Sequence, residues 1–185
     1  MNAMFFGMPI ALFPAMAEGF GGASVGLFYS MMAVGPLVVA LTSGSTARVH
    51  RHGLAITLAV VVWGLAIVGF GLARDLWLAL LLLGLARAAD CVSGLFRMRM
   101  WNQTIPDRLR GRLTSIKLIS YASGPYLGNA EAGLVASAFS VRTSVVSVGV
   151  LCVLGAGVLA LLLPKFLHYD ARAGLARKHA EEVPA

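Results

Sequence analysis

Long apolar runs joined by short polar connections make up most of this chain of 185 residues. Each run approaches the roughly 20 residues that an α-helix needs to cross the hydrocarbon layer of a bilayer. The runs are continuous, whereas the strands of a membrane β-barrel alternate apolar and polar residues over about ten residues. The pattern predicts an all-α, polytopic transmembrane helix bundle over residues 1–167, followed by a polar tail over 168–185. Six spans are predicted, at about residues 3–21, 23–45, 54–73, 77–98, 113–139 and 144–167.

The first and fifth runs are the least typical of membrane spans. The first contains Pro9 and Pro14, and the fifth, the least hydrophobic, is interrupted by Gly124-Pro125. Proline and glycine are tolerated inside membrane helices, because neighbouring helices and side chains satisfy the backbone groups that they free. Both runs therefore belong to the predicted bundle of six helices.

Composition also indicates a membrane protein. Hydrophobic residues make up 58% of the chain and charged residues 12%, whereas a soluble domain carries about 25% charged residues. The formal net charge of +7 would suit a nucleic-acid partner. However, the basic residues stand between the apolar runs and are not interleaved with aromatic residues that would stack on bases. The expected partner is the lipid bilayer and not a nucleic acid.

The positive charges are distributed unequally between the two sets of connections. One set holds Arg48 and Arg51, then several arginines after the fourth run, then the basic tail, whereas the alternate set holds only Arg74 and Arg142. Basic residues near membrane spans stay on the cytoplasmic side. This asymmetry predicts a multi-pass protein of the cell membrane with both termini in the cytoplasm, as an even number of spans requires.

Two charges of opposite sign lie deep in the fourth run. With Trp77 as its outer boundary, Arg87 lies ten residues into the helix, at a depth of about 15 Å. A charge near the bilayer centre costs about 2.5–3.5 kcal/mol on insertion scales, so it needs a partner or a polar cavity. Asp90 lies three residues further on the same helical face, and Arg97 continues the stripe. Two interpretations apply: a structural ion pair within the helix, or a substrate path in which Asp90 exchanges a proton.

The fifth run contributes a second group of polar candidates. Glu131 lies beside Asn129 in the outer part of the predicted span. It is interpreted either as a proton or cation site or as an interfacial carboxylate that reaches the outside water. Tyr126, on the same helix, is a candidate contact for an aromatic substrate.

No arrangement of residues predicts an enzyme, a cofactor or a metal site. Ser93 has no histidine at membrane depth to activate it as a nucleophile, and no Gly-rich phosphate loop with its lysine is present. Cys91 and Cys152 lie in separate apolar runs without metal-type spacing. His50 and His52 lie in a short basic turn, which we interpret as a solvated loop.

Two polar connections carry recognisable strings. The turn after the second run begins at Gly44 and continues to Arg48 and Arg51. The turn after the fourth run reads Pro-Asp-Arg-Leu-Arg-Gly-Arg over residues 106–112, and its candidate residues are Asp107, Arg108, Arg110, Gly111 and Arg112.

In these residues the sequence resembles the major facilitator superfamily of secondary transporters. The first turn is similar to that family's cytoplasmic Gly-x(3–4)-Arg-x-x-Arg loop, although it lacks the acidic residue that usually follows the glycine. The second turn is similar to the loop between the tenth and eleventh helices in the enterobactin-exporter and drug-exporter branch. The opening string from Phe6 to Pro14 is similar to the seventh helix of actinobacterial-type members. The resemblance covers about residues 3–170.

The resemblance implies a particular architecture and function. Such transporters have two six-helix halves, with the substrate bound between them near the bilayer midplane, and this chain resembles the C-terminal half. The implied function is proton-coupled efflux of a small amphipathic molecule, such as a drug or siderophore, across a bacterial inner membrane. A separate N-terminal half, or a second subunit in a homo- or heterodimer, would complete it. The alternative is a truncated, non-transporting remnant or a partner subunit.

The arginine-rich turn has two interpretations of its own. Asp107 follows Pro106 directly, which suits a helix N-terminus, where a carboxylate faces the positive end of the helix dipole. The arginines that follow can pair with acidic groups on neighbouring helix ends or with anionic lipid headgroups. They form either a cytoplasmic gate, whose ion pairs break as the two halves rock, or a charge cluster that only sets the topology.

Overall fold

Every element that the structure describes is a helix. The computed structural model describes residues 10–21, 24–46, 52–104 and 107–162, and no strand occurs within these ranges. The elements are η1 (Ile10–Leu12), α2 (Phe13–Glu18), α3 (Ser24–Thr46), α4 (His52–Leu72), α5 (Leu76–Thr104), α6 (Asp107–Ala138) and α7 (Val141–Leu162). The predicted all-α fold is confirmed. The tail over 168–185 lies outside the described residues.

Four of the described helices are long and apolar enough to cross a membrane. They are Ser24–Leu41 within α3, His52–Leu72, Leu76–Asn102 within α5, and Val141–Leu162. The predicted number of six spans is not confirmed. In the region of the first predicted span, the described part is the turn η1 and the six-residue helix α2. The helix α6, with 32 residues, exceeds the length needed, but its serine, threonine and charged residues make it too polar to count among the four.

The helices α5 and α6 extend further than the hydrophobic pattern predicts. α5 continues to Thr104, beyond the expected end at 98, and α6 begins at Asp107 instead of 113. Backbone hydrogen bonding does not stop where the hydrocarbon layer ends, so polar turns prolong a membrane helix beyond its apolar part. The predicted interruption at Gly124-Pro125 is also absent, since α6 is helical throughout.

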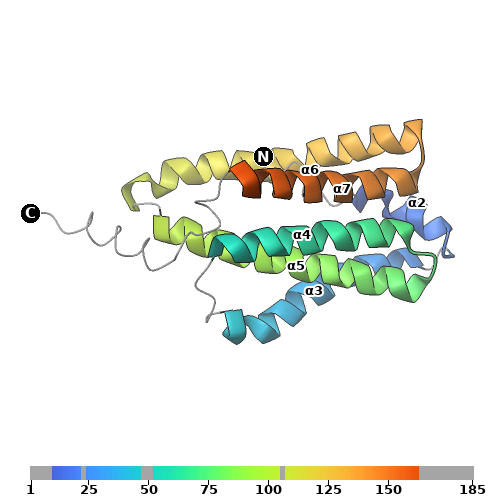
Figure 1. The fold of residues 1–185 in the computed structure, drawn as a ribbon, viewed down its shortest axis with the longest axis horizontal. Coiled ribbons are helices and arrows are strands. Elements are labelled where there is room, and N and C mark those ends of the chain that lie inside the picture. Colours follow the sequence, from blue (N-terminus) through green and yellow to red (C-terminus); the bar gives the residue numbers. More distant parts are fainter. Residues whose placement is uncertain (1–9, 22–23, 47–51, 105–106, 163–185) are drawn as a thin grey trace, which may run out of the picture.

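The helices lie in a layered order around α4. Figure 1 shows α6 and α7 along one side, α4 and α5 in the middle, and α3 along the opposite side. α4 packs against α5 and α7, α3 packs against α5, and α6 packs against α7. α4 therefore holds the centre, and its buried residues include Trp63, Ile67 and Phe70.

Aromatic side chains anchor the short helix α2 to this centre. The Phe13 ring of α2 lies 5.9 Å from Phe28 of α3 and 6.2 Å from Phe70 of α4, and Phe28 lies 5.5 Å from Phe70. All three pairs adopt the edge-to-face geometry that aromatic quadrupoles favour. α2 is thereby fixed to α3 and α4 by side-chain packing, although it is too short to cross the bilayer.

Glycines allow α4 and α7 to approach backbone to backbone. A Cβ atom added to Gly149 would lie 2.7 Å from the carbonyl oxygen of Gly64, and one added to Gly64 would lie 2.6 Å from Val153 Cγ2. Small residues at membrane helix interfaces permit this close approach and increase dispersion contacts between the helices. The α4–α7 interface therefore depends on Gly64 and Gly149.

His52 does not lie in a solvated loop as the sequence suggested. It is the first residue of α4, is 4% exposed, and its ring centroid lies 5.3 Å from that of Phe96 on α5. The turn was interpreted from its local charges, whereas the packing of α4 against α5 determines where this ring lies. His50 lies outside the described residues.

Candidate functional site

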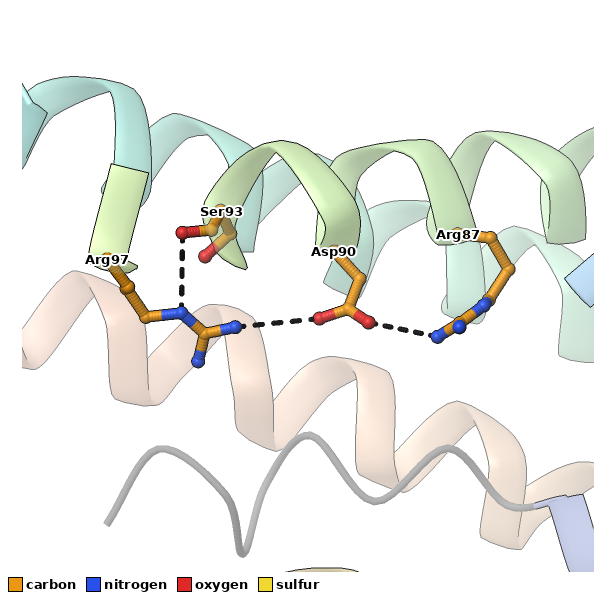
Figure 2. Close-up of polar contacts among 4 residues, drawn as sticks. All are labelled: Arg87, Asp90, Ser93 and Arg97. Carbon is orange, nitrogen blue, oxygen red and sulfur yellow. Dashed lines mark hydrogen bonds and ion pairs between the residues drawn. The ribbon is translucent and has the colours of Figure 1, made fainter. Parts of the chain in front are cut away.

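Three charged side chains on α5 form one connected cluster, which we call the α5 charge cluster: Arg87, Asp90 and Arg97. Arg87 Nη1 donates a hydrogen bond to Asp90 Oδ2 over 2.9 Å, so the pairing expected from their spacing is present. Arg97 Nη2 lies 3.7 Å from the other carboxylate oxygen, Asp90 Oδ1. Arg97 Nε also donates to the backbone carbonyl oxygen of Ser93 over 3.3 Å. Figure 2 shows the three side chains on the same side of α5, with Asp90 between the two arginines.

Two members of the cluster, Arg87 and Asp90, lie deep in a membrane-spanning helix, whereas Arg97 lies near its far end. Arg87 comes eleven residues after Leu76, the first residue of α5, which corresponds to about 16 Å along the helix axis. Charges at such depth are rare in membrane helices and occur mostly toward a bundle interior or a water-filled cavity. The side chains of Arg87 and Asp90 are 22% and 29% exposed, and that of Arg97 is 22% exposed. The cluster is therefore partly accessible from outside this chain.

The backbone of α5 at Arg87 lies directly against the neighbouring helix α3. A Cβ atom added to Gly35 of α3 would lie 2.5 Å from Arg87 Cβ and 2.6 Å from the backbone nitrogen of Ala88. The two backbones are therefore in direct contact at the level of the cluster. The sequence pattern did not single out Gly35. The one feature that could have indicated it is its position within an apolar run, directly before Pro36.

The guanidinium of Arg87 has hydrogen-bonding capacity left over. Its Nε atom is buried and has no hydrogen-bond partner among the described residues. A guanidinium carries several N–H donors in a fixed planar fork, and Asp90 accepts from only one of the donors of Arg87. Arg87 can thus donate to a further acceptor.

The candidates on α6 are not joined to the α5 charge cluster by any described contact. Tyr126 is 77% exposed. Asn129 is half-buried, and its Oδ1 atom is buried without a partner among the described residues. Glu131 lies within α6, but its side chain falls outside the described residues. The proposed roles of these three residues stay predictions.

The loop candidates are described only in part. Gly44 lies in the last turn of α3, and α6 begins at Asp107, as expected for a carboxylate after a proline. Gly111 is exposed, and no atom of the described residues would contact a Cβ added to it. Arg48 and Arg51 lie outside the described residues, as do the side chains of Arg108, Arg110 and Arg112.

A cation–π contact that the sequence did not reveal connects α5 with α6. Lys117 Nζ of α6 lies 4.8 Å from the ring centroid of Trp101 on α5 and 3.6 Å from Met98 Sδ. The sequence signal was a lysine and a tryptophan beside the polar connection between the two helices. The contact joins Trp101, near the end of α5, to Lys117, which lies ten residues after the start of α6.

The cluster is suited to electrostatic binding. Arginine guanidiniums donate to carboxylate and phosphate oxygens in charge-assisted, often bidentate hydrogen bonds. Within the described residues, no group of three or more His, Cys, Asp or Glu side chains is placed to hold a metal ion. The arrangement can therefore hold an acidic group at membrane depth.

Comparison with known proteins gives bacterial exporters. An enterobactin exporter of Shigella flexneri is 30% identical over 126 residues, which are 67% of this chain and 31% of that protein. Enterobactin exporters of Escherichia coli O81 (strain ED1a) and Shigella boydii serotype 18 are each 31% identical over 124 residues, 66% of this chain and 30% of theirs. The matched part spans less than a third of the length of these relatives. No solved structure matches the chain.

The apolar helices and the bacterial relatives together identify a bacterial membrane protein. The family model described as Major Facilitator Superfamily matches residues 1–182, nearly the whole chain. The two turns that resembled this family in the sequence lie inside the matched range. The chain belongs to the major facilitator superfamily.

Proposed function

We propose that this chain is the C-terminal half of a secondary active transporter that exports a small amphipathic molecule from a bacterial cell. The observation that carries the proposal is the α5 charge cluster, because a long apolar helix keeps the charges of Arg87 and Asp90 at membrane depth. Intramembrane charges of this kind mark substrate or ion pathways. Family membership and the relatives named enterobactin exporters support the same function.

The surface of α6 bears on whether a second protein half or subunit packs against this bundle. It packs against α7 and η1, and its exposed residues are both polar, such as Tyr126, and apolar, such as Ile119 and Leu134. Such a mixed surface allows a protein neighbour as well as lipid tails. A separate N-terminal half, or a second subunit, would place the substrate path between itself and this bundle. We take both chain termini to be cytoplasmic, from the distribution of arginines.

In this proposal the export is coupled to protons, and Asp90 is the coupling residue. Its carboxylate is held by Arg87 on one side and faces Arg97 on the other, so its protonation would release both arginines. The arginine-rich start of α6 acts as the cytoplasmic gate. The second candidate is a non-transporting remnant or a partner subunit.

The test is efflux of a fluorescent amphipathic dye from bacterial cells that express the chain in its native genomic context, so that any partner half is present. Asp90→Asn should abolish the efflux that a protonophore also abolishes, with an unchanged amount of protein in the membrane. Asp75→Asn is the matched control, since Asp75 is an exposed carboxylate just before α5. Unchanged efflux in Asp90→Asn would refute the coupling role. Absence of efflux in every strain would favour the non-transporting alternative.

A further inference from the structure

We infer that Lys117 of α6 and Trp101 of α5 form a latch that closes the charged side of α5 toward the cytoplasm. Opening of this latch admits water and solutes to the α5 charge cluster. The inference rests on the proposed function, because it takes the charged side of α5 as the transport path. It goes beyond that function, because it assigns control of the path to a contact within this chain.

The latch joins two helices whose main packing partners are different. α5 packs mainly against α3 and α4, whereas α6 packs mainly against α7. Lys117 Nζ extends from α6 to within 4.8 Å of the Trp101 ring centroid and 3.6 Å of Met98 Sδ. A lysine ammonium within about 6 Å of an aromatic ring centroid is attracted by the quadrupole of the ring. Long side chains therefore link α5 to α6 at this position.

The latch lies on the same side of α5 as the charge cluster. Trp101 follows Arg97 by four residues and Asp90 by eleven, and residues at these spacings lie on one side of a helix with about 3.6 residues per turn. Trp101 also comes three residues before Thr104, the last residue of α5. Lys117 therefore lies over the strip of α5 that leads from the cluster to the end of the helix. We take this end to be cytoplasmic, because the arginine-rich connection follows it.

The strength of the latch suits an element that opens and closes. Lys117 and Trp101 are each half-buried. A cation–π contact at an exposed site changes an equilibrium about two- to fivefold, which corresponds to about 0.5–1 kcal/mol. The lysine ammonium is carried on a flexible four-carbon stem, so it can leave the ring without movement of the α6 backbone. The contact therefore favours the closed arrangement without locking it.

Cys91 is a natural reporter on the same side of α5. It follows Asp90 directly and is partly exposed, whereas the second cysteine of the chain, Cys152, is buried. Cys91 precedes Met98 by seven residues, or about two helical turns, so it lies deeper in the membrane than the latch. The reaction of Cys91 with a charged thiol reagent therefore measures how readily water reaches this side of α5.

The experiment labels inverted membrane vesicles from bacteria that express the chain in its native genomic context. The reagent is methanethiosulfonate ethylsulfonate, which does not cross membranes, and mass spectrometry of the peptides follows the labelling of each cysteine. Lys117→Gln and Trp101→Leu should each raise the labelling rate of Cys91 about two- to fivefold. The double variant should label no faster than either single variant, because both substitutions remove the same contact. Cys152 should stay unlabelled throughout.

Two control variants test the chemistry and the place of the contact. Lys117→Arg keeps a cation over the ring and should label at the rate of wild type. Arg99→Gln removes another cation–π contact of α5, since Arg99 Cζ lies 5.7 Å from the Phe96 ring centroid. However, Arg99 and Trp101 lie on opposite sides of the helix, so this variant should leave Cys91 labelling unchanged. In spheroplasts, where the reagent meets the outer face of the membrane, Lys117→Gln should also label like wild type.

The outcomes separate this inference from the proposed function. Unchanged Cys91 labelling in both Lys117→Gln and Trp101→Leu would overturn the latch. An equal increase in Arg99→Gln, or labelling of Cys152, would also overturn it, because a general loosening of the bundle would then explain the effect. Either result leaves the protonophore-sensitive dye efflux untouched. Faster Cys91 labelling in the two latch variants alone supports the latch even if no strain exports dye, because labelling requires no transport.

Discussion

Substitution of Gly35 by alanine tests whether α3 positions the α5 charge cluster. The added Cβ would lie 2.5 Å from Arg87 Cβ, 2.6 Å from the backbone nitrogen of Ala88 and 2.7 Å from the carbonyl carbon of Arg87. Carbon atoms in good contact are about 3.5–4.0 Å apart. Because two of these three neighbours are backbone atoms, a change of rotamer cannot relieve the clash, and α3 must move away from α5 by about 1 Å.

The expected cost follows from this movement. A gap of about 0.5–1 Å forfeits roughly a quarter to a half of the dispersion energy of each affected contact, and overpacked core sites lose about 1–3 kcal/mol of unfolding free energy. The matched control is Gly26→Ala in the same helix, where no atom of the described residues lies within 4 Å of the added Cβ. This control should gain about 0.5–1 kcal/mol, because glycine is less favourable than alanine inside a helix. Gly35→Ala makes the same gain in helix propensity, so the two variants should differ by the packing cost alone, about 1–3 kcal/mol.

Reversible unfolding in mixed detergent micelles, followed by tryptophan fluorescence, measures both variants against wild type. Gly35→Ala should also lower the protonophore-sensitive dye efflux, since Arg87 moves with the α5 backbone, whereas Gly26→Ala should not. A Gly35→Ala protein as stable as Gly26→Ala would refute the close contact between α3 and α5. Reduced stability with unchanged dye efflux would refute only the link between that contact and the cluster.

Two further predictions concern the other helix contacts. Gly149→Ala should lower the unfolding free energy by about 1–3 kcal/mol, because its Cβ would lie 2.7 Å from the Gly64 carbonyl oxygen. The control is Gly155→Ala, whose added Cβ meets no atom of the described residues within 4 Å. Equal stability of the two variants in the same unfolding assay would contradict the packing of α4 on α7. A double-mutant cycle with Lys117→Gln and Trp101→Leu should give a coupling energy of about 0.5–1 kcal/mol for an exposed cation–π contact, and a coupling energy near zero would show that the contact does not hold α5 to α6.

The apolar pattern was sufficient to predict four long helices, because a run of about 20 apolar residues has few alternatives to a membrane helix. It did not predict where α5 and α6 end, since polar turns at Thr104 and Asp107 remain helical outside the apolar part. It also could not show that α2 is a six-residue helix. That helix is fixed by the packing of Phe13 on two other helices, and such packing has no local signature.

In the candidate site, too, the sequence could predict some contacts and not others. The contact of Arg87 with Asp90 follows from their spacing within one helix, so the sequence could predict it. The role of Gly35 depends on which residue of α3 faces α5, and the position of Lys117 over Trp101 depends on how two helix ends meet. Contacts between helices require the tertiary arrangement, and the positions of charges along one chain do not contain it.

The central position of α4 has a consequence for biosynthesis. Its two main neighbours are α5, which follows it directly, and α7, which is synthesised last among the described helices. Until α7 leaves the translocon, the Gly64 side of α4 lacks the partner that it has in the folded bundle. The bundle therefore cannot close progressively as each helix inserts, and a ribosome that stalls before Val141 would leave an open intermediate for quality-control proteases to remove.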